Sequence, residues 1–452
     1  MIKKISFMLA ALTVGTVSAK KNPQPNVVII FADDMGYGDL SCYGNPTIPT
    51  PNLDKMATNG AKFTQFYVGA SVCTPSRAAL LTGCFPKRVG LEKNVLMPWD
   101  KIGLNPKEQT LPRQLKDAGY TTACVGKWHL GYQKEFMPWN HGFDMFYGFP
   151  YSNDMSKREQ KILNPKWNYP YTLAFISQKD TLEVDPDQHN ITRKLTNKSV
   201  DFIKNNRKKP FFLYLAYPMP HVPVYASKEY EGSTKRGKYG DAVAEVDWGV
   251  GQVLDALKKS KLDKNTIVIF SSDNGPWKVY KTEGGSAGPL HGAKGTLWEG
   301  GLRVPTIAYW PKHINPGIRV SPVRAMDILP SIMKLCNAPM PTNKIDGVDV
   351  SHYILDGNQK VDQQPMLYYD KKGIARGIRV GAYKFLELKG KKHLFNVEVD
   401  ISEDYNIIKK HAKLAERLEK QMHDMDNEIV KGRRAPAEVD YVMAPKPDNR
   451  KK

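Results

Sequence analysis

Oxygen-bearing side chains follow two apolar runs of this 452-residue sequence. Asp33 and Asp34 come after NVVIIFA, and Asp273 and Asn274 come shortly after TIVIFS. In open α/β sheets, ligands bind outside the carboxyl ends of the strands, so the four side chains can share one site. Carboxylate and amide oxygens suit Ca²⁺ or Mg²⁺ better than Zn²⁺. A single Asp-Asp pair after a strand is usually a turn or a helix cap, but two such strand ends favour a metal site.

Four basic side chains follow further apolar runs and could handle an anion or a proton. Lys127 and His129 lie in GKWHLG, after an expected strand at 121–125. If this strand continues, both side chains point to the same face, where a lysine suits an anionic group and a histidine suits a proton transfer. The alternative is a solvated lysine and a hydrogen-bonded core histidine. His221, after FFLYLAY, and Lys294, in a glycine-rich stretch, leave similar alternatives open.

Cys73 begins the segment CTPSRAALLTG, whose pattern predicts a helix. Pro75 suits the first helical turn, and the alanines and leucines at 78–81 continue the helix. Cys73 would therefore face the positive partial charge of a helix N-terminus. A thiol in that position is expected to have a lowered pKa, and the alternative is an ordinary buried cysteine.

The elements that must position these residues alternate along the chain. From residue 26 to about residue 308, uninterrupted apolar runs suit strands that are buried on both faces, and helical patterns lie between them. One helix is expected to begin at Thr110 and to stop at Gly119, and another is expected at 241–259. This alternation predicts an α/β domain with a largely parallel sheet and helices on both sides.

The sequence pattern changes after about residue 341. Short strands are expected at 366–369, 374–380, 384–388 and 393–397. Separated by Gly and Lys turns, they predict a small antiparallel sheet. A polar helix is expected near 407–424, and the Pro- and Lys-rich residues 435–452 are expected to be loose. The predicted fold class is therefore a large α/β domain plus a smaller α+β one.

The composition is that of a globular protein. With 41% hydrophobic and 25% charged residues, it excludes wholesale disorder and a multi-span membrane protein. Lys and Arg number 66 against 46 Asp and Glu, which gives a net charge of +20. Such a surplus attracts nucleic acid, anionic membrane or acidic polysaccharide. No nucleic-acid partner is expected, because nothing except net charge favours one.

Residues 1–19 have the pattern of a secretory signal peptide. Lys3 and Lys4 form a basic start, an apolar stretch covers 5–17, and small residues favour cleavage near Ala19. The stretch is too short to span a membrane, and no other run approaches about eighteen apolar residues, so no stable membrane anchor is expected. We expect an exported protein, either periplasmic or secreted. Its five cysteines are an odd number, which raises the question of which thiol is special.

Two long motifs resemble the signatures of one enzyme family. CTPSRAALLTG matches C-x-P-S-R-x-x-x-x-T-G, and residues 119–131 match G-Y-x-T-x-x-x-G-K-W-H-L-G. Asp33-Asp34, Asp273-Asn274 and the Glu299-Gly300-Gly301 turn after Lys294 also fall in the expected order. The chain therefore resembles the type I, formylglycine-dependent sulfatases of the alkaline-phosphatase superfamily, in the branch of arylsulfatase A and N-acetylgalactosamine sulfatases. The resemblance implies an alkaline-phosphatase-like α/β fold, with a large mixed, mostly parallel sheet sandwiched by helices. The implied divisions are a signal peptide (1–19), a catalytic domain (20–345) and a C-terminal subdomain with a basic tail (346–452).

The resemblance also implies a modified nucleophile and a metal ion. A dedicated maturation enzyme would oxidise Cys73 to formylglycine (3-oxoalanine), whose hydrate attacks the substrate. A divalent cation, Ca²⁺ rather than Mg²⁺, would be held by the modified residue 73 together with Asp33, Asp34, Asp273 and Asn274.

Five further residues match catalytic positions of the family. Lys127 and Lys294 would bind the sulfate group, and Arg77 would orient the formylglycine. His221 would protonate the leaving alcohol. His129 would remove the remaining diol proton, so that sulfate leaves and the aldehyde is restored. Each such proton transfer is typically worth about 10²–10⁴ in rate.

A sulfated carbohydrate is the expected substrate and partner. Export, positive charge and aromatic residues near the active-site loop favour a sugar over a steroid or a simple aryl ester; these residues are Trp277, Tyr280 and Trp298. The branch includes exo-acting enzymes on sulfated galactose or N-acetylgalactosamine, so a sugar of this type is favoured. Ser152 matches a pocket-lining serine. His291 and Lys278 could contact the sugar, and equally could be solvated loop residues.

Two other functions stay open. The first is a phosphonate monoester or phosphodiester hydrolase of the same superfamily, although Lys127, His129 and the neutral ligand Asn274 favour sulfate. The second is a non-catalytic glycan-binding protein with a sulfatase fold, which would be expected to lose a site residue, and none is missing here. One position departs from the family, since Cys84 stands where relatives often have arginine, and any contact of that arginine is in doubt.

Overall fold

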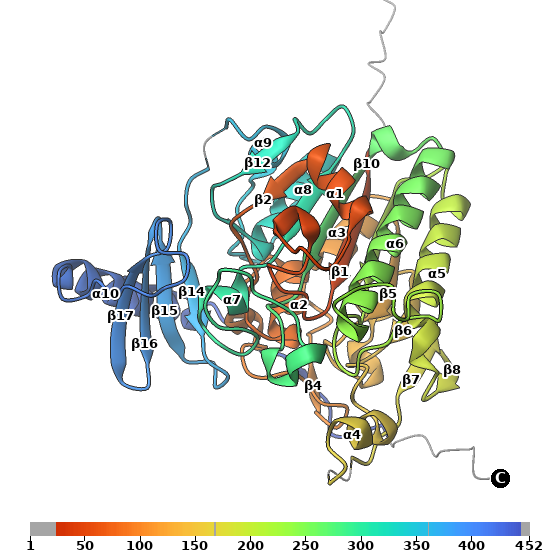
Figure 1. Cartoon of the computed structure of the whole chain (residues 1–452), viewed down its shortest axis with the longest axis horizontal. Coiled ribbons are helices and arrows are strands. Elements are labelled where there is room, and N and C mark those ends of the chain that lie inside the picture. Colours follow the sequence, from red (N-terminus) through yellow and green to blue (C-terminus); the bar gives the residue numbers. More distant parts are fainter. Residues whose placement is uncertain (1–23, 167–168, 360, 444–452) are drawn as a thin grey trace, which may run out of the picture.

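The computed structural model describes residues 24–166, 169–359 and 361–443 (Figure 1). The predicted signal peptide lies outside the described residues. A ten-stranded sheet forms the centre of the molecule, in the order β12-β2-β11-β10-β1-β9-β5-β6-β7-β8. In that order, the strands are Gly317–Arg319, Ala61–Phe63, Thr306–Tyr309, Thr266–Ser272, Asn26–Ala32, Phe211–Ala216, Thr121–Lys127, Met145–Phe149, Ala174–Ser177 and Asp180–Val184.

The sheet is mixed but mostly parallel at its centre. β10, β1, β9, β5 and β6 are parallel to one another, whereas β11, β7 and β8 pair antiparallel with their neighbours. Every residue of β1, β9 and β10 is buried, as their uninterrupted apolar sequences predict. Alternate residues of β1 enter different cores, with Val27 and Ile29 on one face and Val28 and Ile30 on the other. The predicted fold class is confirmed.

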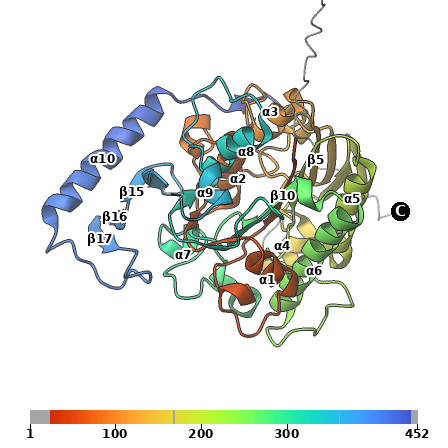
Figure 2. The same cartoon turned by 90° about the horizontal axis from the view of Figure 1, so that it is seen from above.

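Figure 2 shows the two helical layers from above, with α1, α5 and α6 on one side of the sheet and α2, α3 and α8 on the other. These helices are Pro51–Thr58 (α1), Ile191–Asn205 (α5), Lys238–Lys259 (α6), Cys73–Thr82 (α2), Leu111–Asp117 (α3) and Ile328–Cys336 (α8). The shorter elements are Phe66–Tyr67 (β3) with Val323–Arg324 (β13), Ile102–Gly103 (β4) with Ala437–Glu438 (β18), Lys157–Leu163 (α4), Glu299–Leu302 (α7) and Ser351–Leu355 (α9). Within the described ranges, no helix is long and apolar enough to cross a membrane.

Two helices begin or end elsewhere than the sequence predicts. α6 begins at Lys238, about one turn earlier, and the Asp241 carboxylate in that turn accepts hydrogen bonds from the loop before it, including one of 2.9 Å from the Thr234 nitrogen. The polar helix α10 covers Ala412–Lys431 instead of 407–424. It starts later because the Ile407 nitrogen donates a hydrogen bond of 2.9 Å to the carbonyl of Leu394, within the strand Lys391–Asn396.

A four-stranded antiparallel sheet and α10 form the C-terminal part, at the left of Figure 1. Its strands are Met366–Tyr369 (β14), Ala375–Val380 (β15), Tyr383–Leu388 (β16) and Lys391–Asn396 (β17). Buried ion pairs join this sheet to α7, since Lys384 lies 3.0 Å from Glu299 and 2.8 Å from Glu403. The division of the chain at residue 345 stays a prediction.

Candidate active site

The carboxyl ends of β1 and β10 bring the two predicted acidic pairs together. The Asp34 nitrogen donates a hydrogen bond of 3.1 Å to Asp273 Oδ1, and Asn274 Nδ2 donates one of 2.7 Å to Asp34 Oδ1. Asp33 lies beside them, and all four side chains are buried. The strands are parallel neighbours, so the residues that follow them meet at one edge of the sheet. We call these four residues, Asp33, Asp34, Asp273 and Asn274, the acidic cluster.

Two buried cations, Lys127 and Arg77, and the partly buried Lys294 face the carboxylates of the acidic cluster. The ion pairs are Lys127 with Asp33, Lys294 with Asp34 and Arg77 with Asp273. Burial raises the pKa of Asp33, but Lys127 and Arg77 outweigh this effect and hold the pKa below its ordinary value. At Asp34 burial outweighs the neighbouring cation and raises the pKa to about 7. The site is therefore a compact set of opposite charges removed from water.

The donor atoms fit a hard divalent cation. Ligand atoms of Asp33, Asp34, Cys73 and His221 lie within 4.8 Å of one another. Asn274 Oδ1 is buried and has no hydrogen-bond partner in the described part of the chain, a costly arrangement unless a cation or water meets it. Carboxylate and amide oxygens are ligands that Ca²⁺ prefers. His221 is therefore a further candidate metal ligand, which the sequence did not predict.

Cys73 is the first residue of α2, as the sequence predicts, and its Sγ atom lies 3.5 Å from Asp33 Oδ1. The predicted lowering of its pKa is wrong. Burial raises the pKa of the thiol well above its ordinary value, and the nearby Lys127 and Lys294 offset only part of the rise. The residue is 1% exposed. Burial therefore destabilises the thiolate more than the positive partial charge of the helix N-terminus stabilises it.

The sequence predicts that His129 lies on a continuation of the strand that carries Lys127, and the structure does not confirm this. β5 ends at Lys127 and His129 has a φ of 62°, so the strand does not continue to it. Its Nε2 atom lies 3.0 Å from the Leu96 carbonyl, and because a carbonyl only accepts, Nε2 carries the proton. Nδ1 is buried and meets no partner among the described residues. Burial, together with Lys127 and Arg77, lowers the pKa of His129 well below its ordinary value, so the ring is neutral with a free lone pair on Nδ1.

His221 follows β9, and a hydrogen bond at Nδ1 holds its ring. Its Nδ1 atom donates a hydrogen bond of 2.7 Å to the Val222 carbonyl, and its Nε2 atom lies 3.6 Å from Asp34 Oδ2. The ring lies 5.4 Å from that of Trp277, over which Lys294 Nζ stands at 4.3 Å. Burial and Lys294 lower the pKa of His221 well below its ordinary value.

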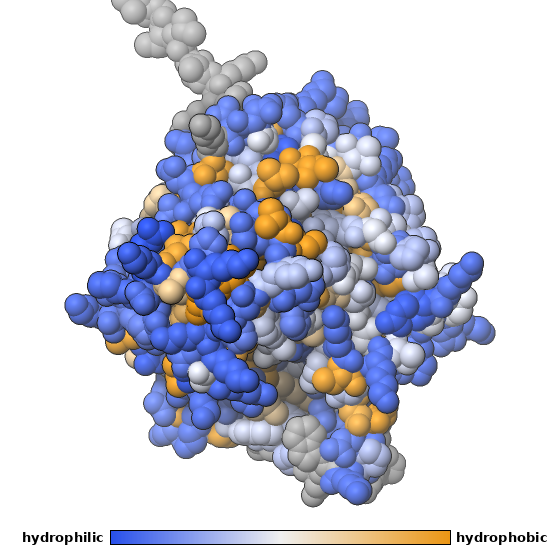
Figure 3. Space-filling view, turned by 60° about the vertical axis from the view of Figure 1, so that its left-hand side comes forward, coloured by the Kyte–Doolittle hydropathy of each residue, from blue (hydrophilic) through white to orange (hydrophobic). Residues whose placement is uncertain are grey.

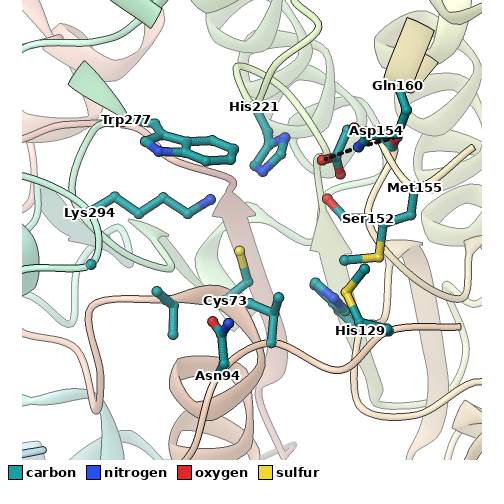
Figure 4. A pocket seen from close by; sticks show the side chains of 14 residues that line it. Cys73, Asn94, His129, Ser152, Asp154, Met155, Gln160, His221, Trp277 and Lys294 are labelled. Atoms are coloured by element: carbon teal, nitrogen blue, oxygen red, sulfur yellow. Dashed lines mark hydrogen bonds between the residues drawn. The ribbon is translucent and has the colours of Figure 1, made fainter. Parts of the chain in front are cut away.

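One cavity of about 350 Å³ lies at this site, and its lining includes Cys73, His129, Ser152, His221, Trp277 and Lys294. Figure 4 shows the sulfur of Cys73 pointing into this cavity, with Trp277 and Lys294 on one side and Asp154 on the other. The structure therefore brings the predicted nucleophile, both histidines and Lys294 to one cavity. Lys127 lies behind its wall and donates a hydrogen bond of 3.0 Å to the lining residue Ser152.

Sequence reasoning missed Asp154, which also lines the cavity. Its Oδ2 atom accepts a hydrogen bond of 3.2 Å from Gln160 Nε2, while Oδ1 is buried and lacks a partner within the described structure. Asp154 comes soon after β6, two positions beyond Ser152. The rule that selected Asp33, which looks for polar residues after a strand, could have found it.

Other residues predicted near the substrate lie outside this cavity. His291 is exposed and stacks on Trp298, with ring centroids 4.2 Å apart, and neither residue lines the cavity. Lys278 is exposed, and Tyr280 packs edge-on against Trp277 at 4.8 Å. Of the three predicted aromatic residues, Trp277 is the one in the lining.

The sequence matches known proteins over most of its length. A family model described as Sulfatase matches residues 25–338. Arylsulfatase A of Homo sapiens is 38% identical over 398 residues, which cover 83% of this chain and 77% of that protein. N-acetylgalactosamine-6-sulfatase of Rattus norvegicus is 39% identical over 394 residues, which cover 83% of this chain and 74% of that protein. The crystal structure of Ps i-CgsB in complex with k-i-k-neocarrahexaose matches with a TM-score of 0.79 at 32% identity, over 89% of this chain and 92% of that one.

Proposed function

The chain belongs to the sulfatase family and is a sulfuric ester hydrolase; we propose that its substrate is a sulfated carbohydrate and that residue 73 acts as formylglycine. The observation that carries the proposal is that Cys73 and Lys294 line one cavity and both contact the acidic cluster behind it. Cys73 Sγ lies 3.5 Å from Asp33 Oδ1, and Lys294 forms an ion pair with Asp34. In-line attack on a sulfate ester spreads negative charge over the peripheral oxygens of sulfur. Cations aimed at those oxygens stabilise the transition state more than the ground state.

The nucleophile in this proposal is the hydrated formylglycine formed from Cys73. The raised pKa of the buried thiol makes its thiolate scarce at neutral pH, so the unmodified cysteine is a weak nucleophile. Since Cys73 is buried in the folded chain, we expect the maturation enzyme to act before folding is complete.

The surrounding charges would bind and orient the ester. Lys127 and Lys294 would hold the sulfate oxygens, and Arg77 keeps Asp273 in place. When the acidic cluster binds Ca²⁺, the ion would supply positive charge to the nucleophile and to one sulfate oxygen. The buried position of these groups strengthens each interaction, because little water screens it.

The two histidines would divide the proton transfers. His129 lines the cavity and has an unprotonated Nδ1 atom with no partner among the described residues, which suits a base that accepts the second proton of the diol. We assign the proton of the leaving alcohol to His221, which lines the cavity beside Trp277. Its Nε2 atom lies 3.6 Å from Asp34 Oδ2, and this carboxylate would offset part of the effect of burial and Lys294, which lower the pKa of the ring.

The walls of the cavity support a sugar as the leaving group. Trp277 offers an apolar surface on one side, and Asp154 offers a free buried oxygen on the other, which suits a sugar hydroxyl. The names of the relatives include an N-acetylgalactosamine-6-sulfatase, and the matched crystal structure holds an oligosaccharide. A galactose or N-acetylgalactosamine type of sugar is therefore our proposal, and export to the periplasm or medium remains part of it.

Three measurements test this function. Mass spectrometry of the peptide that carries residue 73 is expected to show formylglycine, and a panel of sulfated monosaccharides is expected to release inorganic sulfate. An aryl phosphodiester tested in parallel is expected to react much more slowly than an aryl sulfate. Sulfate release by protein with an unmodified Cys73 would contradict the proposed nucleophile, and preference for the phosphodiester would contradict the proposed substrate class.

A further inference from the structure

A second groove adjoins the active-site cavity. It has a volume of about 960 Å³ and shares Val72 and Gly295 with that cavity. Its far wall includes two turns of the C-terminal sheet, around 370–374 and 389–391. Figure 3 brings this side of the molecule forward and shows hydrophilic side chains over most of it. A chain molecule held in the cavity could therefore continue along the groove.

The charges along this groove do not balance. Its lining contains five exposed lysines that form no ion pair with any residue the structure describes: Lys93, Lys371, Lys372, Lys389 and Lys391. The acidic side chains of the groove, in contrast, are all held by arginines. Glu92 lies 3.1 Å from Arg433, and Arg376 lies 3.2 Å from Asp370 and 3.3 Å from Glu387. The five lysine charges are thus left without a fixed counter-ion.

Tight turns hold several of these lysines in place. The Asp370 Oδ1 atom accepts hydrogen bonds of 2.8 Å from the Lys372 nitrogen and 3.1 Å from the Ile374 nitrogen, which fixes the turn between β14 and β15. Lys389 and Gly390 both have positive φ angles, of 50° and 74°, in the turn between β16 and β17. Anion binding by fixed turns loses less conformational entropy than binding by a flexible segment.

We propose that this lysine groove binds sulfate groups on the sugars next to the one in the cavity, so that the protein acts on chains with several sulfates. The inference rests on the proposed function, because it takes the cavity to hold one sugar sulfate and the groove to hold its neighbours. Lysines in a groove that leads to the cavity attract a polyanion and steer it to the reaction site. A nucleic acid is the competing polyanion, and the test includes it.

Two matched triple variants test the groove. Lys371→Gln, Lys372→Gln and Lys391→Gln remove three groove lysines and keep their apolar stems. The control carries Lys204→Gln, Lys208→Gln and Lys209→Gln, which remove three exposed lysines at and after the end of α5, away from the groove. Lys389 is left unchanged, since its positive φ would complicate a substitution. The probe is a hexasaccharide of chondroitin 6-sulfate, titrated calorimetrically into the full-length mature protein at low and at physiological ionic strength.

Binding of the hexasaccharide is expected to be about tenfold weaker in the groove variant, to change little in the control, and to depend less on salt in the groove variant than in the wild type. The desulfated hexasaccharide is expected to bind much more weakly to the wild type. Equal losses in the two variants would overturn the proposal, because general surface charge would then explain binding. Equally tight and equally lysine-dependent binding of a single-stranded oligonucleotide would overturn the choice of a sulfated glycan.

Turnover of 4-nitrophenyl sulfate by the wild-type protein tests the proposed function separately. If this ester is cleaved and the hexasaccharide does not distinguish the two variants, the groove proposal fails and the sulfatase assignment stands. If neither the ester nor any sulfated sugar is cleaved while lysine-dependent binding persists, the proposed function fails and the groove survives as a binding site alone.

Discussion

Arg77 donates two hydrogen bonds, of 3.0 and 2.8 Å, to a single oxygen of Asp273, its Oδ2 atom. A third hydrogen bond, of 2.9 Å, goes from Arg77 Nη1 to the carbonyl of Lys127. The guanidinium therefore ties α2 to the ends of β10 and β5, about one helical turn after Cys73. Since Arg77 is fully buried, it fixes the geometry of the site as well as its charge.

Replacing Arg77 should test this tie. Arg77→Ala is expected to lower the free energy of unfolding by about 3–5 kcal/mol, because Asp273 becomes an unpaired buried charge. Arg77→Lys keeps the charge but loses the planar fork, so aryl sulfate turnover is expected to fall about 100-fold with a smaller loss of stability. Urea unfolding and kcat measure the two effects, with Arg113→Lys as the control. A wild-type unfolding midpoint for Arg77→Ala would contradict the structural role.

Cys73 should be indispensable for turnover but not for folding. Cys73→Ala removes one buried sulfur, and turnover is expected to vanish while the thermal midpoint changes by only a few degrees. Cys73→Ser is expected to be inactive where only a cysteine-type maturation system operates, because the modifying enzyme then leaves serine unchanged. Both variants are assayed with an aryl sulfate after mass spectrometry of residue 73. Activity in the alanine variant would exclude the covalent mechanism.

The strand ends of the site were predictable from sequence because buried parallel strands are continuous apolar runs. β1 and β10 therefore located Asp33 and Asp273, and the helix pattern located Cys73. The predicted continuation of β5 to His129 was wrong, because the positive φ of His129 depends on the tertiary path of the chain after β5. The pKa of Cys73 also depends on tertiary burial, which the position at a helix N-terminus does not reveal.

Residues outside a motif or a strand end were harder to assign. Asp154 is identified as a site residue by the cavity, because its carboxylate and Cys73 line the same space. His291 and Trp298 were expected near the substrate, but they stack on each other outside the cavity. Proximity along the sequence to Lys294 was a weak guide, since a loop can turn its side chains in any direction.

Asp154 is expected to select the sugar part of the substrate. Its free Oδ1 atom can accept a hydrogen bond from a sugar hydroxyl, and a hydrogen bond to a charged acceptor is worth about 1.5–3 kcal/mol. Asp154→Ala should therefore raise KM for a sulfated monosaccharide about 10- to 100-fold. The same variant should show a much smaller change with an aryl sulfate, which has no hydroxyl at that distance. Equal effects on both substrates would contradict this role.

Calcium should stabilise the folded protein through the acidic cluster. Addition of Ca²⁺ to chelator-treated protein is expected to raise the thermal midpoint, with about 2.7 kcal/mol gained at a concentration 100 times the dissociation constant. Asn274→Leu removes the unpartnered amide oxygen and should reduce this shift by at least half. Asn164→Leu, at the C-terminal end of α4, is the control. A Ca²⁺ shift of full size in the Asn274 variant would show that the ion binds elsewhere.

Glu403 lies where the C-terminal sheet meets α7. Its Oε2 atom accepts a hydrogen bond of 2.7 Å from the Glu299 nitrogen, and its carboxylate pairs with the buried Lys384. Burial raises the pKa of Glu403 to about 7, with Glu299 adding to the rise and Lys384 opposing it. The pKa of Glu299 is lowered to about 2, since Lys384 and Arg379 outweigh its burial, so Glu299 stays ionised above pH 5.

The pH dependence of stability follows from the sign of the Glu403 shift. The folded state holds the Glu403 proton more tightly than the unfolded state does. The bound proton therefore adds to the free energy of unfolding. This contribution is fully present below about pH 4.5 and is lost as pH rises through about 7. Glu403→Gln removes this titration while keeping the shape of the side chain. Between pH 5 and 7.5, the wild type is expected to lose about 2 kcal/mol of unfolding free energy relative to Glu403→Gln, measured by urea unfolding. The exposed Glu398→Gln serves as the control and should follow the wild type. Identical pH profiles for the wild type and Glu403→Gln would refute the assignment.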